Sequence, residues 1–382
     1  MRNRNAPARS RLFSSAVTSA VTVAAALLFA APVVGDVTLE DIIENVRRNE
    51  ALYDDLDVVV ITDFEADPKT LPPPTDTWSS SLTSHSSTHS VHQAGLFRID
   101  RSGENQTNVG AVPMDRTVAY DGETTKLYSE RTIANLSQGR CDDAELVRPH
   151  TILSRKLLNQ GVPLSVFLSG HDAIRSHPLG KLNEALTMRV ALGGEVTHEG
   201  LLCRTVVVDV LKSSGEVHNR REFHLAIERN YLPLRVLAFT YHVSRDVPVG
   251  EGIVTNLLEL IPGIWFPSHA EYTGYDQDLL KQEGRRQWTW RNHYTVETVS
   301  LDPKYPLDFF REVDFAPGTA VYEVEGGKIT RSYRLGAPGA PGSPQRLVSR
   351  QWSVAVGVLV AILGVGSIVV AFKKRARQRD QV

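Results

Sequence analysis

Apolar residues along the middle of the chain fall into runs that are typical of β-strands. Seven segments are rich in β-branched and aromatic residues and are separated by Gly, Pro, Asn and Asp: residues 57–66, 94–100, 117–130, 187–211, 221–243, 263–275 and 286–301. In the fifth segment, Phe223, Leu225 and Ile227 alternate with polar residues, so one face of that strand is turned to a core or cavity and the other to water. The pattern predicts a large antiparallel sheet.

Three other segments depart from the strand pattern. Leu39, Ile42 and Val46 fall near helical spacing in residues 38–56, which predicts an amphipathic helix packed on the sheet. Residues 150–170 cluster Leu, Ile and Phe and predict one or two short helices that cover the sheet. Residues 70–90 are rich in Pro, Ser and Thr and predict an exposed loop.

The C-terminal region carries the longest apolar run. No residue from 352 to 372 is charged, and at about 1.5 Å of helix rise per residue such a run crosses a hydrocarbon core of about 30 Å. We therefore predict a transmembrane helix over residues 352–372, the alternative being a buried core helix. Residues 373–382 are mostly basic and predict a cytoplasmic tail, because basic residues beside a span favour that side.

The N-terminal residues agree with this orientation. Residues 1–35 combine a basic start, an apolar stretch and small residues at Val33 and Gly35, which predicts a signal peptide cleaved before Asp36. An uncleaved signal anchor is the alternative and leaves the following residues on the same side. Residues 36–335 are then an ectodomain in the periplasm or outside the cell, joined by a Gly/Pro linker, 336–351, to a span in the inner (plasma) membrane.

Composition narrows the classes of partner. The chain has 382 residues, a formal net charge of −2 and 42% hydrophobic residues, values that indicate neither disorder nor a nucleic-acid-binding protein. Anionic lipid head groups explain the basic cluster beside the span. Cys141 and Cys203 are the two cysteines; a disulfide is allowed in an oxidising compartment, and two separate thiols are the alternative.

Candidate chemistry is sparse. His85, His89 and His92 would share one face of a helix and hold zinc, but Ser and Thr surround them, and in a strand His92 would face away from the other two. We therefore predict no metal and no other cofactor. The sequence has no nucleophile elbow, HExxH motif, phosphate-binding glycine loop or CxxC pair, which favours a non-catalytic protein.

Several segments resemble the LolA-like superfamily of outer-membrane lipoprotein carrier and sorting proteins. In residues 221–239, Ile227, Pro233 and Arg235 stand where that family has a strand and its returning partner, and residues 44–65, 118–130, 263–274 and 309–327 also look alike. The resemblance covers residues 38–335. It implies an α+β, β-rich fold: a curved antiparallel sheet forming an incomplete barrel, covered by short helices, whose concave side holds acyl chains. The family's carriers are soluble, whereas this chain ends in a predicted span.

Aromatic residues supply the candidate site. A group of large apolar side chains on the later strands lines either an apolar cavity or an ordinary core: Trp265, Phe266, Trp288, Trp290, Tyr294, Phe223, Leu225 and Ile227. We therefore expect a binding protein that holds a lipid, a lipoprotein acyl chain or another apolar ligand at a membrane. The alternative is an envelope sensor or scaffold that binds a partner protein through the same ectodomain.

Overall fold

The computed structural model describes residues 37–70, 81–107, 110–129, 132–141, 146–153, 162–170, 187–336 and 345–346. The predicted signal peptide, transmembrane helix and tail lie outside the described residues, as does most of the predicted linker. Among the described residues, no helix has the length and apolarity needed to cross a bilayer. Everything below concerns residues 39 onward, which form one compact unit.

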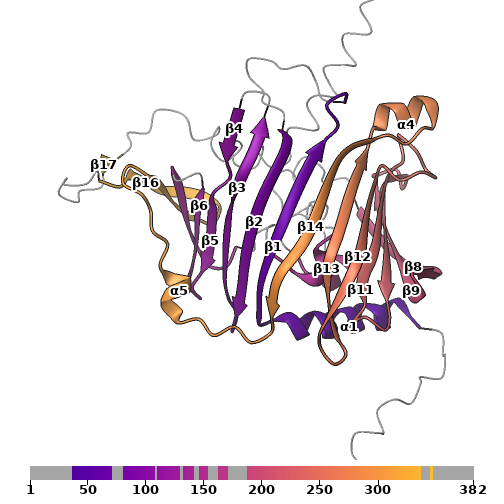
Figure 1. Cartoon of the computed structure of the whole chain (residues 1–382), viewed down its shortest axis with the longest axis horizontal. Coiled ribbons are helices and arrows are strands. Elements are labelled where there is room, and N and C mark those ends of the chain that lie inside the picture. Colours follow the sequence, from indigo (N-terminus) through magenta and orange to yellow (C-terminus); the bar gives the residue numbers. More distant parts are fainter. Residues whose placement is uncertain are drawn as a thin grey trace, which may run out of the picture. The chain divides into compact units, whose positions relative to one another are not determined.

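One seventeen-stranded sheet makes up this unit (Figure 1). Sixteen of its strands follow one another from edge to edge as β8 (Thr187–His198), β9 (Leu201–Leu211), β10 (Val217–Ala226), β11 (Leu232–Thr240), β12 (Gly250–Ile261), β13 (Ile264–Tyr275), β14 (Trp288–Ser300), β1 (Leu56–Ala66), β2 (Ser81–Gln93), β3 (Leu96–Thr107), β5 (Arg116–Tyr120), β6 (Thr124–Ser129), β7 (Ile133–Gln138), β15 (Ala320–Glu325), β16 (Lys328–Arg334) and β17 (Gln345–Arg346). The short β4 (Gly110–Pro113) pairs with the far end of β3.

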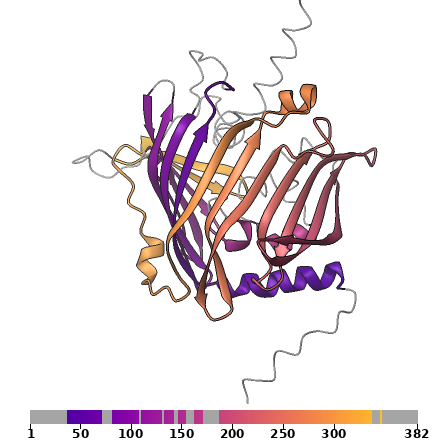
Figure 2. The same cartoon turned by 45° about the vertical axis from the view of Figure 1, so that its right-hand side comes forward.

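The sheet is strongly curved and does not close (Figure 2). Within the described residues, the edge strand β8 pairs only with β9 and the edge strand β17 only with β16. This confirms the predicted β-rich, curved and open sheet. The expectation of a purely antiparallel sheet is wrong at one place, because β7 and β15 run parallel. Residues 345–346 of the predicted linker also form a strand, β17.

Few helices accompany the sheet. They are α1 (Leu39–Glu50) with the 3-10 turn η1 (Ala51–Tyr53), η2 (Pro149–Thr151), α2 (Leu164–Leu168), α4 (Gln277–Glu283) and α5 (Leu307–Arg311). The predicted N-terminal helix is confirmed: Ile42 and Val46 are buried, while acidic residues occupy its first turn and basic residues its last, as the helix dipole favours. In both views α1 runs along the lower ends of the strands (Figures 1 and 2).

Alternation in the strands defines two faces. On β1, the side chains of Leu56, Val58 and Val60 are fully buried, whereas the residues between them are partly exposed. We call the face that bears these three residues the inner face and the opposite one the outer face. Cross-strand pairing then assigns the neighbouring strands to the same two faces, because directly paired residues point the same way.

The predicted loop at residues 70–90 is wrong over its second half. Residues 81–93 form β2, which pairs with β1 on one side and β3 on the other. Ser86, Thr88 and Ser90 are buried on the inner face; Ser90, for example, lies between Val58 of β1 and Ile99 of β3. A tight reversal joins β10 to β11, where Asn230 and Tyr231 both have φ of 54°, in the left-handed region.

Candidate ligand-binding face

The inner face is covered by the chain's own side chains. Two segments between β7 and β8, residues 146–153 and 164–168, lie against it; we call them the cover. Leu146 packs with Phe97, Ile99 and Val118 of β3 and β5. Further along, the ring of Phe167 meets that of Phe223 on β10 edge-on, with centroids 5.9 Å apart.

Seven apolar side chains of the cover are at most 5% exposed: Leu146, Val147, Ile152, Leu153, Leu164, Phe167 and Leu168. The predicted short helices over the sheet are therefore found in part, as η2 and α2. Residues 154–161 of that prediction lie outside the described residues. The cover thus completes a core that the sheet alone would leave open to water.

Side-chain hydrogen bonds help to hold the cover in place. The Val147 N–H donates to Ser90 Oγ at 3.4 Å, and His150 Nε2 lies 2.8 Å from the Asn230 carbonyl oxygen. At the other end, the Glu50 carboxylate accepts the N–H of Leu164 at 2.6 Å. No described residue of the cover belongs to a strand of the sheet. Apolar contact and a few side-chain bonds therefore fix the cover, rather than a backbone ladder.

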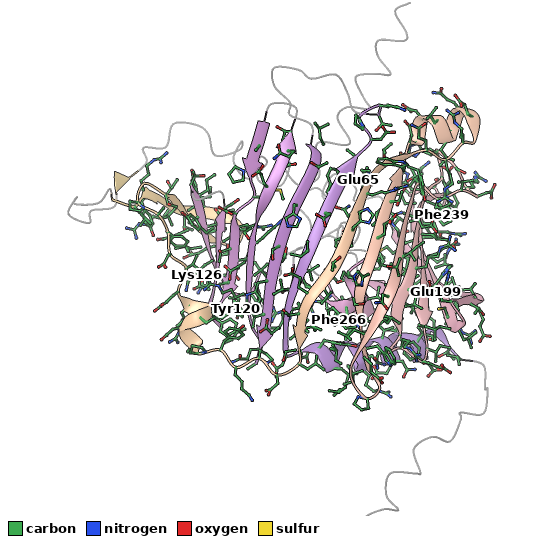
Figure 3. All side chains as sticks on the ribbon, viewed as in Figure 1. Glu65, Tyr120, Lys126, Glu199, Phe239 and Phe266 are labelled. Atoms are coloured by element: carbon green, nitrogen blue, oxygen red, sulfur yellow. The ribbon has the colours of Figure 1, made fainter. Side chains whose placement is uncertain are left out.

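Most of the predicted site residues lie on the inner face. Phe223 and Leu225 are fully buried there on β10, and Phe266 is fully buried on β13, where its ring meets Tyr53 edge-on at 6.1 Å. Figure 3 labels Phe266 near the lower end of β13. Tyr294 on β14 is 6% exposed and pairs with Ala270. These positions follow from simple alternation along each strand.

Trp290 packs against two aromatic rings and the backbone of a glycine. Its ring stacks on Tyr272 with centroids 5.3 Å apart and lies 6.5 Å from the ring of Phe64. The backbone beneath it is Gly274, where a Cβ atom would sit 2.4 Å from the indole ring, so only glycine fits that position. Trp290 itself is only partly buried, and so offers an aromatic surface on the inner face.

The structure does not bring the other three predicted residues to the inner face. Trp265 is paired with Glu259 and carries the guanidinium of Arg229 on its ring at 4.1 Å. The guanidinium carbon of Arg291 lies over the Trp288 ring, 4.7 Å from its centroid. Ile227 lies beyond the end of β10 and is partly exposed. A register shift between Gly274 and Tyr275 sets Trp288 apart from Trp290, so the alternation counted along the sequence fails there.

Sequence analysis did not identify the polar side chains buried on the inner face. His92 is 6% exposed, and among the described residues its ring Nε2 has no hydrogen-bond partner. Burial is the main reason that its pKa is lowered to about 3, and the cations Arg148 and Arg140 add to the effect. At neutral pH this imidazole is uncharged. In the sequence, Ser86, Thr88, Ser90 and His92 stand at every second position, which is the spacing of residues that share one face of a strand.

The other two histidines of that segment point to the outer face. His85 Nδ1 lies 2.7 Å from Asp63 Oδ1, and His89 Nε2 lies 2.8 Å from Asp57 Oδ1. The predicted separation of His92 from them in a strand is confirmed. Within the described part of the chain, no group of three or more His, Cys, Asp or Glu side chains is arranged to hold a metal ion.

The two cysteines are free thiols. Cys203 on β9 is fully buried, and burial raises its pKa to about 11. Cys141 follows β7 and is exposed. The disulfide considered from the sequence is therefore not formed; Cys203 lies within β9 and Cys141 follows β7, and these two strands do not neighbour each other in the sheet.

The outer face is polar and rich in ion pairs. Glu251 on β12 accepts hydrogen bonds from Arg235 Nε at 2.7 Å and Arg286 Nη2 at 2.6 Å. Burial opposes ionisation of Glu251, but the two guanidinium groups outweigh it and lower the pKa of this carboxyl. Arg235, one of the residues on which the family resemblance rests, thus has a structural partner on the outer face.

Two adjoining hollows also lie on the outer face, beside α5. The larger has a volume of about 580 Å³ and the smaller about 330 Å³, and both reach Thr117 and Tyr128. Arg98 lines the larger one and is fully engaged: its guanidinium donates to Asp100 at 2.7 Å and to the carbonyl oxygen of Phe309 at 2.7 Å. These contacts fasten α5 to the sheet, so the larger hollow is the space between α5 and the strands. The smaller hollow lies over β2, β3 and β5 and is lined by polar side chains such as His89, Asp100 and Arg116.

Comparisons with known proteins do not place the chain in a family. No family model matches it, and no curated protein matches it. Among solved structures it is similar to a DUF1329 family protein from Desulfovibrio piger, at 14% identity, covering 72% of this chain and 97% of that one with a TM-score of 0.38. A putative outer membrane lipoprotein-sorting protein domain from Vibrio parahaemolyticus gives 9% identity, coverage of 71% and 97%, and a TM-score of 0.35.

Lipoprotein LppX from Mycobacterium tuberculosis gives 10% identity, coverage of 69% and 99%, and a TM-score of 0.22. With every TM-score below 0.5, these similarities assign neither a family nor a function. The resemblance to LolA-like proteins stays a prediction from the sequence.

Proposed function

We propose that this protein is a non-catalytic, membrane-anchored binding protein of the extracytoplasmic space, which holds a lipid, a lipoprotein acyl chain or another apolar ligand on the inner face of its sheet. The ligand takes the place of the cover. The observation that carries the proposal is how the cover is held: seven of its apolar side chains are buried against the sheet, and none of its described residues belongs to a strand. An apolar ligand can replace contacts of that kind.

The magnitudes of the two sets of contacts are similar. Burying seven apolar side chains stabilises the cover by roughly 10–20 kcal/mol, at about 1.5–3 kcal/mol each. An acyl chain of about sixteen carbons gains about 0.8 kcal/mol per buried CH₂, or roughly 12 kcal/mol in all. The free energy gained by burying one acyl chain is therefore close to that lost by exposing the cover, and a ligand with two acyl chains would gain more than the cover loses.

The predicted signal peptide and transmembrane span support the proposed location at the inner (plasma) membrane. A binding site tethered there meets lipids and lipoproteins as they leave the membrane. Fixed attachment favours hand-over at the surface rather than shuttling, since the linker predicted at residues 336–351 limits the reach of the ectodomain.

Quenching of tryptophan fluorescence tests the proposal. The full chain, reconstituted in nanodiscs, is titrated with a sixteen-carbon acyl chain brominated near its middle, because bromine quenches indole only at contact distance. Trp290 is on the inner face, whereas Trp265 carries Arg229 on the outside. We expect saturable quenching that falls in Trp290→Phe and persists in Trp265→Phe. The contribution of Trp352 is common to both variants and cancels in the comparison.

Equal quenching in the two variants, or none beyond that of Trp352, would refute binding on the inner face. The second outcome, combined with stable capture of one envelope protein by the same nanodiscs, is what the sensor or scaffold alternative predicts.

A further inference from the structure

Exposed apolar side chains gather at one end of the domain, around the reversal between β10 and β11. In the part of the chain that the structure describes, eight large hydrophobic side chains are 39–52% exposed. Four of the eight belong to elements that meet at this reversal: Leu52, Leu202, Leu258 and Ile261. Single exposed apolar residues are ordinary on a protein surface, whereas a group of them marks an interaction surface.

Asn230 ties α1 to the hairpin between β12 and β13. Its side-chain amide donates to Asn49 Oδ1 of α1 at 3.1 Å and to the Gly263 carbonyl oxygen at 3.0 Å. Its Oδ1 accepts the Trp265 N–H at 2.8 Å. The reversal, the end of α1 and the hairpin therefore form one fixed end of the domain.

Backbone contacts bring the remaining two apolar residues to the same end. Leu52 lies in η1, where the hydroxyl of the next residue, Tyr53, donates to the Trp265 carbonyl oxygen. Leu202, near the start of β9, accepts the N–H of Ile227 on its carbonyl oxygen at 3.3 Å, and Ile227 leads into the reversal.

The hairpin between β12 and β13 protrudes from this end. It extends past α1 in both views (Figures 1 and 2). Residues 257–265, which we call the tip, read LLELIPGIW. Leu258 is 44% exposed, and Ile261 is 52% exposed, the largest value of the eight. Gly263 turns the chain with a φ of 82°, after Pro262. The tip is therefore convex and apolar.

The polar groups of the tip suit the head-group level of a bilayer. The guanidinium of the exposed Arg229 lies over the Trp265 ring at 4.1 Å. Glu259 is the acidic residue of the tip, and its carboxylate is turned back to accept the Gly263 N–H at 2.8 Å. Trp residues are enriched where a membrane meets water, and Arg can keep its charged end in water while its stem lies on apolar surface.

A bilayer is the partner that fits this end. A convex apolar tip inserts into a soft apolar phase more readily than it encloses a ligand, and the span predicted at residues 352–372 would keep such a phase beside the domain. The cover is also held here, since His150 Nε2 lies 2.8 Å from the Asn230 carbonyl oxygen. An acyl chain that leaves a bilayer at this end meets the cover directly.

We propose that this end of the domain docks on the outer surface of the anchoring membrane, with Leu258 and Ile261 among the upper parts of the acyl chains and Trp265 at head-group level. The inference rests on the proposed function, because it needs the anchor, and it adds the surface by which the domain meets the bilayer. A bromine in the middle of an acyl chain lies deeper than Trp265 in this arrangement, so the quenching contrast with Trp290 is unaffected.

A polarity-sensitive fluorescent probe tests the docking. The full chain with Cys141→Ser is reconstituted in phosphatidylcholine nanodiscs, part of whose lipid carries a nitroxide near the top of one acyl chain. A nitrobenzoxadiazole group is attached at Ile261→Cys, while the buried Cys203 stays unlabelled. We expect blue-shifted emission and severalfold stronger nitroxide quenching than for the same group at Ile329→Cys. That position is the matched control, because Ile329 is 47% exposed and lies on β16.

The outcomes separate this inference from the proposed function. The same group at Ser353→Cys, within the predicted span, reports anchoring: without quenching there, the anchored location fails and docking fails with it. Quenching at 353 but not at 261, or equal quenching at 261 and 329, leaves the anchor standing and refutes docking of this end. A blue shift at 261 that needs an added envelope protein also refutes it, since the occupant is then a protein.

Discussion

Glu50 joins α1 to the cover, and its removal should have opposite effects on stability and on ligand affinity. It is the last residue of α1, and its carboxylate accepts the backbone N–H groups of Leu164 at 2.6 Å and Ser165 at 3.3 Å, as well as the Ser165 hydroxyl. These N–H groups are the first donors of the five-residue helix α2, and its N-cap residue, Pro163, makes no side-chain cap hydrogen bond.

The magnitude follows from these contacts. Hydrogen bonds to a charged group contribute about 1.5–3 kcal/mol, and the loss of a helix cap costs about 1 kcal/mol. Glu50→Ala should therefore lower the free energy of unfolding by about 2–3 kcal/mol. If the cover competes with the ligand, part of that loss makes displacement easier, and 1.4 kcal/mol of it would tighten acyl-chain binding about tenfold.

Urea unfolding followed by circular dichroism measures the first effect, and titration with the brominated acyl chain measures the second. Glu44→Ala is the control on the same helix, because Glu44 is exposed and pairs with Arg47 and Arg48, surface contacts worth about 0.5 kcal/mol. A variant that loses stability and also loses affinity would show that the cover forms part of the ligand site. The competition argument would then be wrong.

Three further predictions come from single positions. The pKa of His92 is about 3 in the folded chain, below its ordinary value of 6.5, so its contribution to stability is complete above pH 6.5 and is lost as the pH falls toward 3. At pH 5 the loss in the free energy of unfolding is about 2 kcal/mol. Urea unfolding at pH 7 and pH 5 should therefore show a weaker pH dependence of stability in His92→Leu than in the wild type. Gly274→Ala should displace the Trp290 ring and cost about 1–3 kcal/mol, seen as a changed near-ultraviolet circular dichroism signal. A thiol reagent should modify Cys141 at once and Cys203 only after unfolding.

The regular part of the fold could be predicted because local pattern and final environment agree. In α1 the helical spacing of Ile42 and Val46 matches their burial. Phe223 and Leu225 reach the inner face by the alternation visible in the sequence. In each case one element buries one side, so periodicity alone fixes which residues are inside.

Prediction failed at β2 because this segment is made a strand by pairing with β1 and β3 on its two sides, rather than by its own composition. Ser86, Thr88 and Ser90 are buried beside Thr62, Val60 and Val58 of β1, their cross-strand partners. A stretch of small polar residues has no hydrophobic period, so its composition indicates a loop. Tertiary pairing overrides that local preference.

Backbone irregularities account for the misplaced tryptophans. Trp288 and Trp290 are two residues apart and would share a face of a regular strand, but the register shift opposite Gly274 and Tyr275 intervenes. Trp265 is the second residue of β13 and precedes the fully buried Phe266, so alternation turns only one of the two inward. The sequence does not mark the register shift.

The polar residues of the inner face argue that this surface is selected for more than stability. A core chosen for stability alone would place apolar side chains at every inward position of β2, since each unsatisfied buried polar atom is unfavourable. Among the described residues, no side chain or backbone group satisfies the ring Nε2 of His92. An inward imidazole left in this way is a local conflict within the fold, and such conflicts are concentrated at binding sites. Under the proposed function, the cover is an occupant of this face that an apolar ligand can replace.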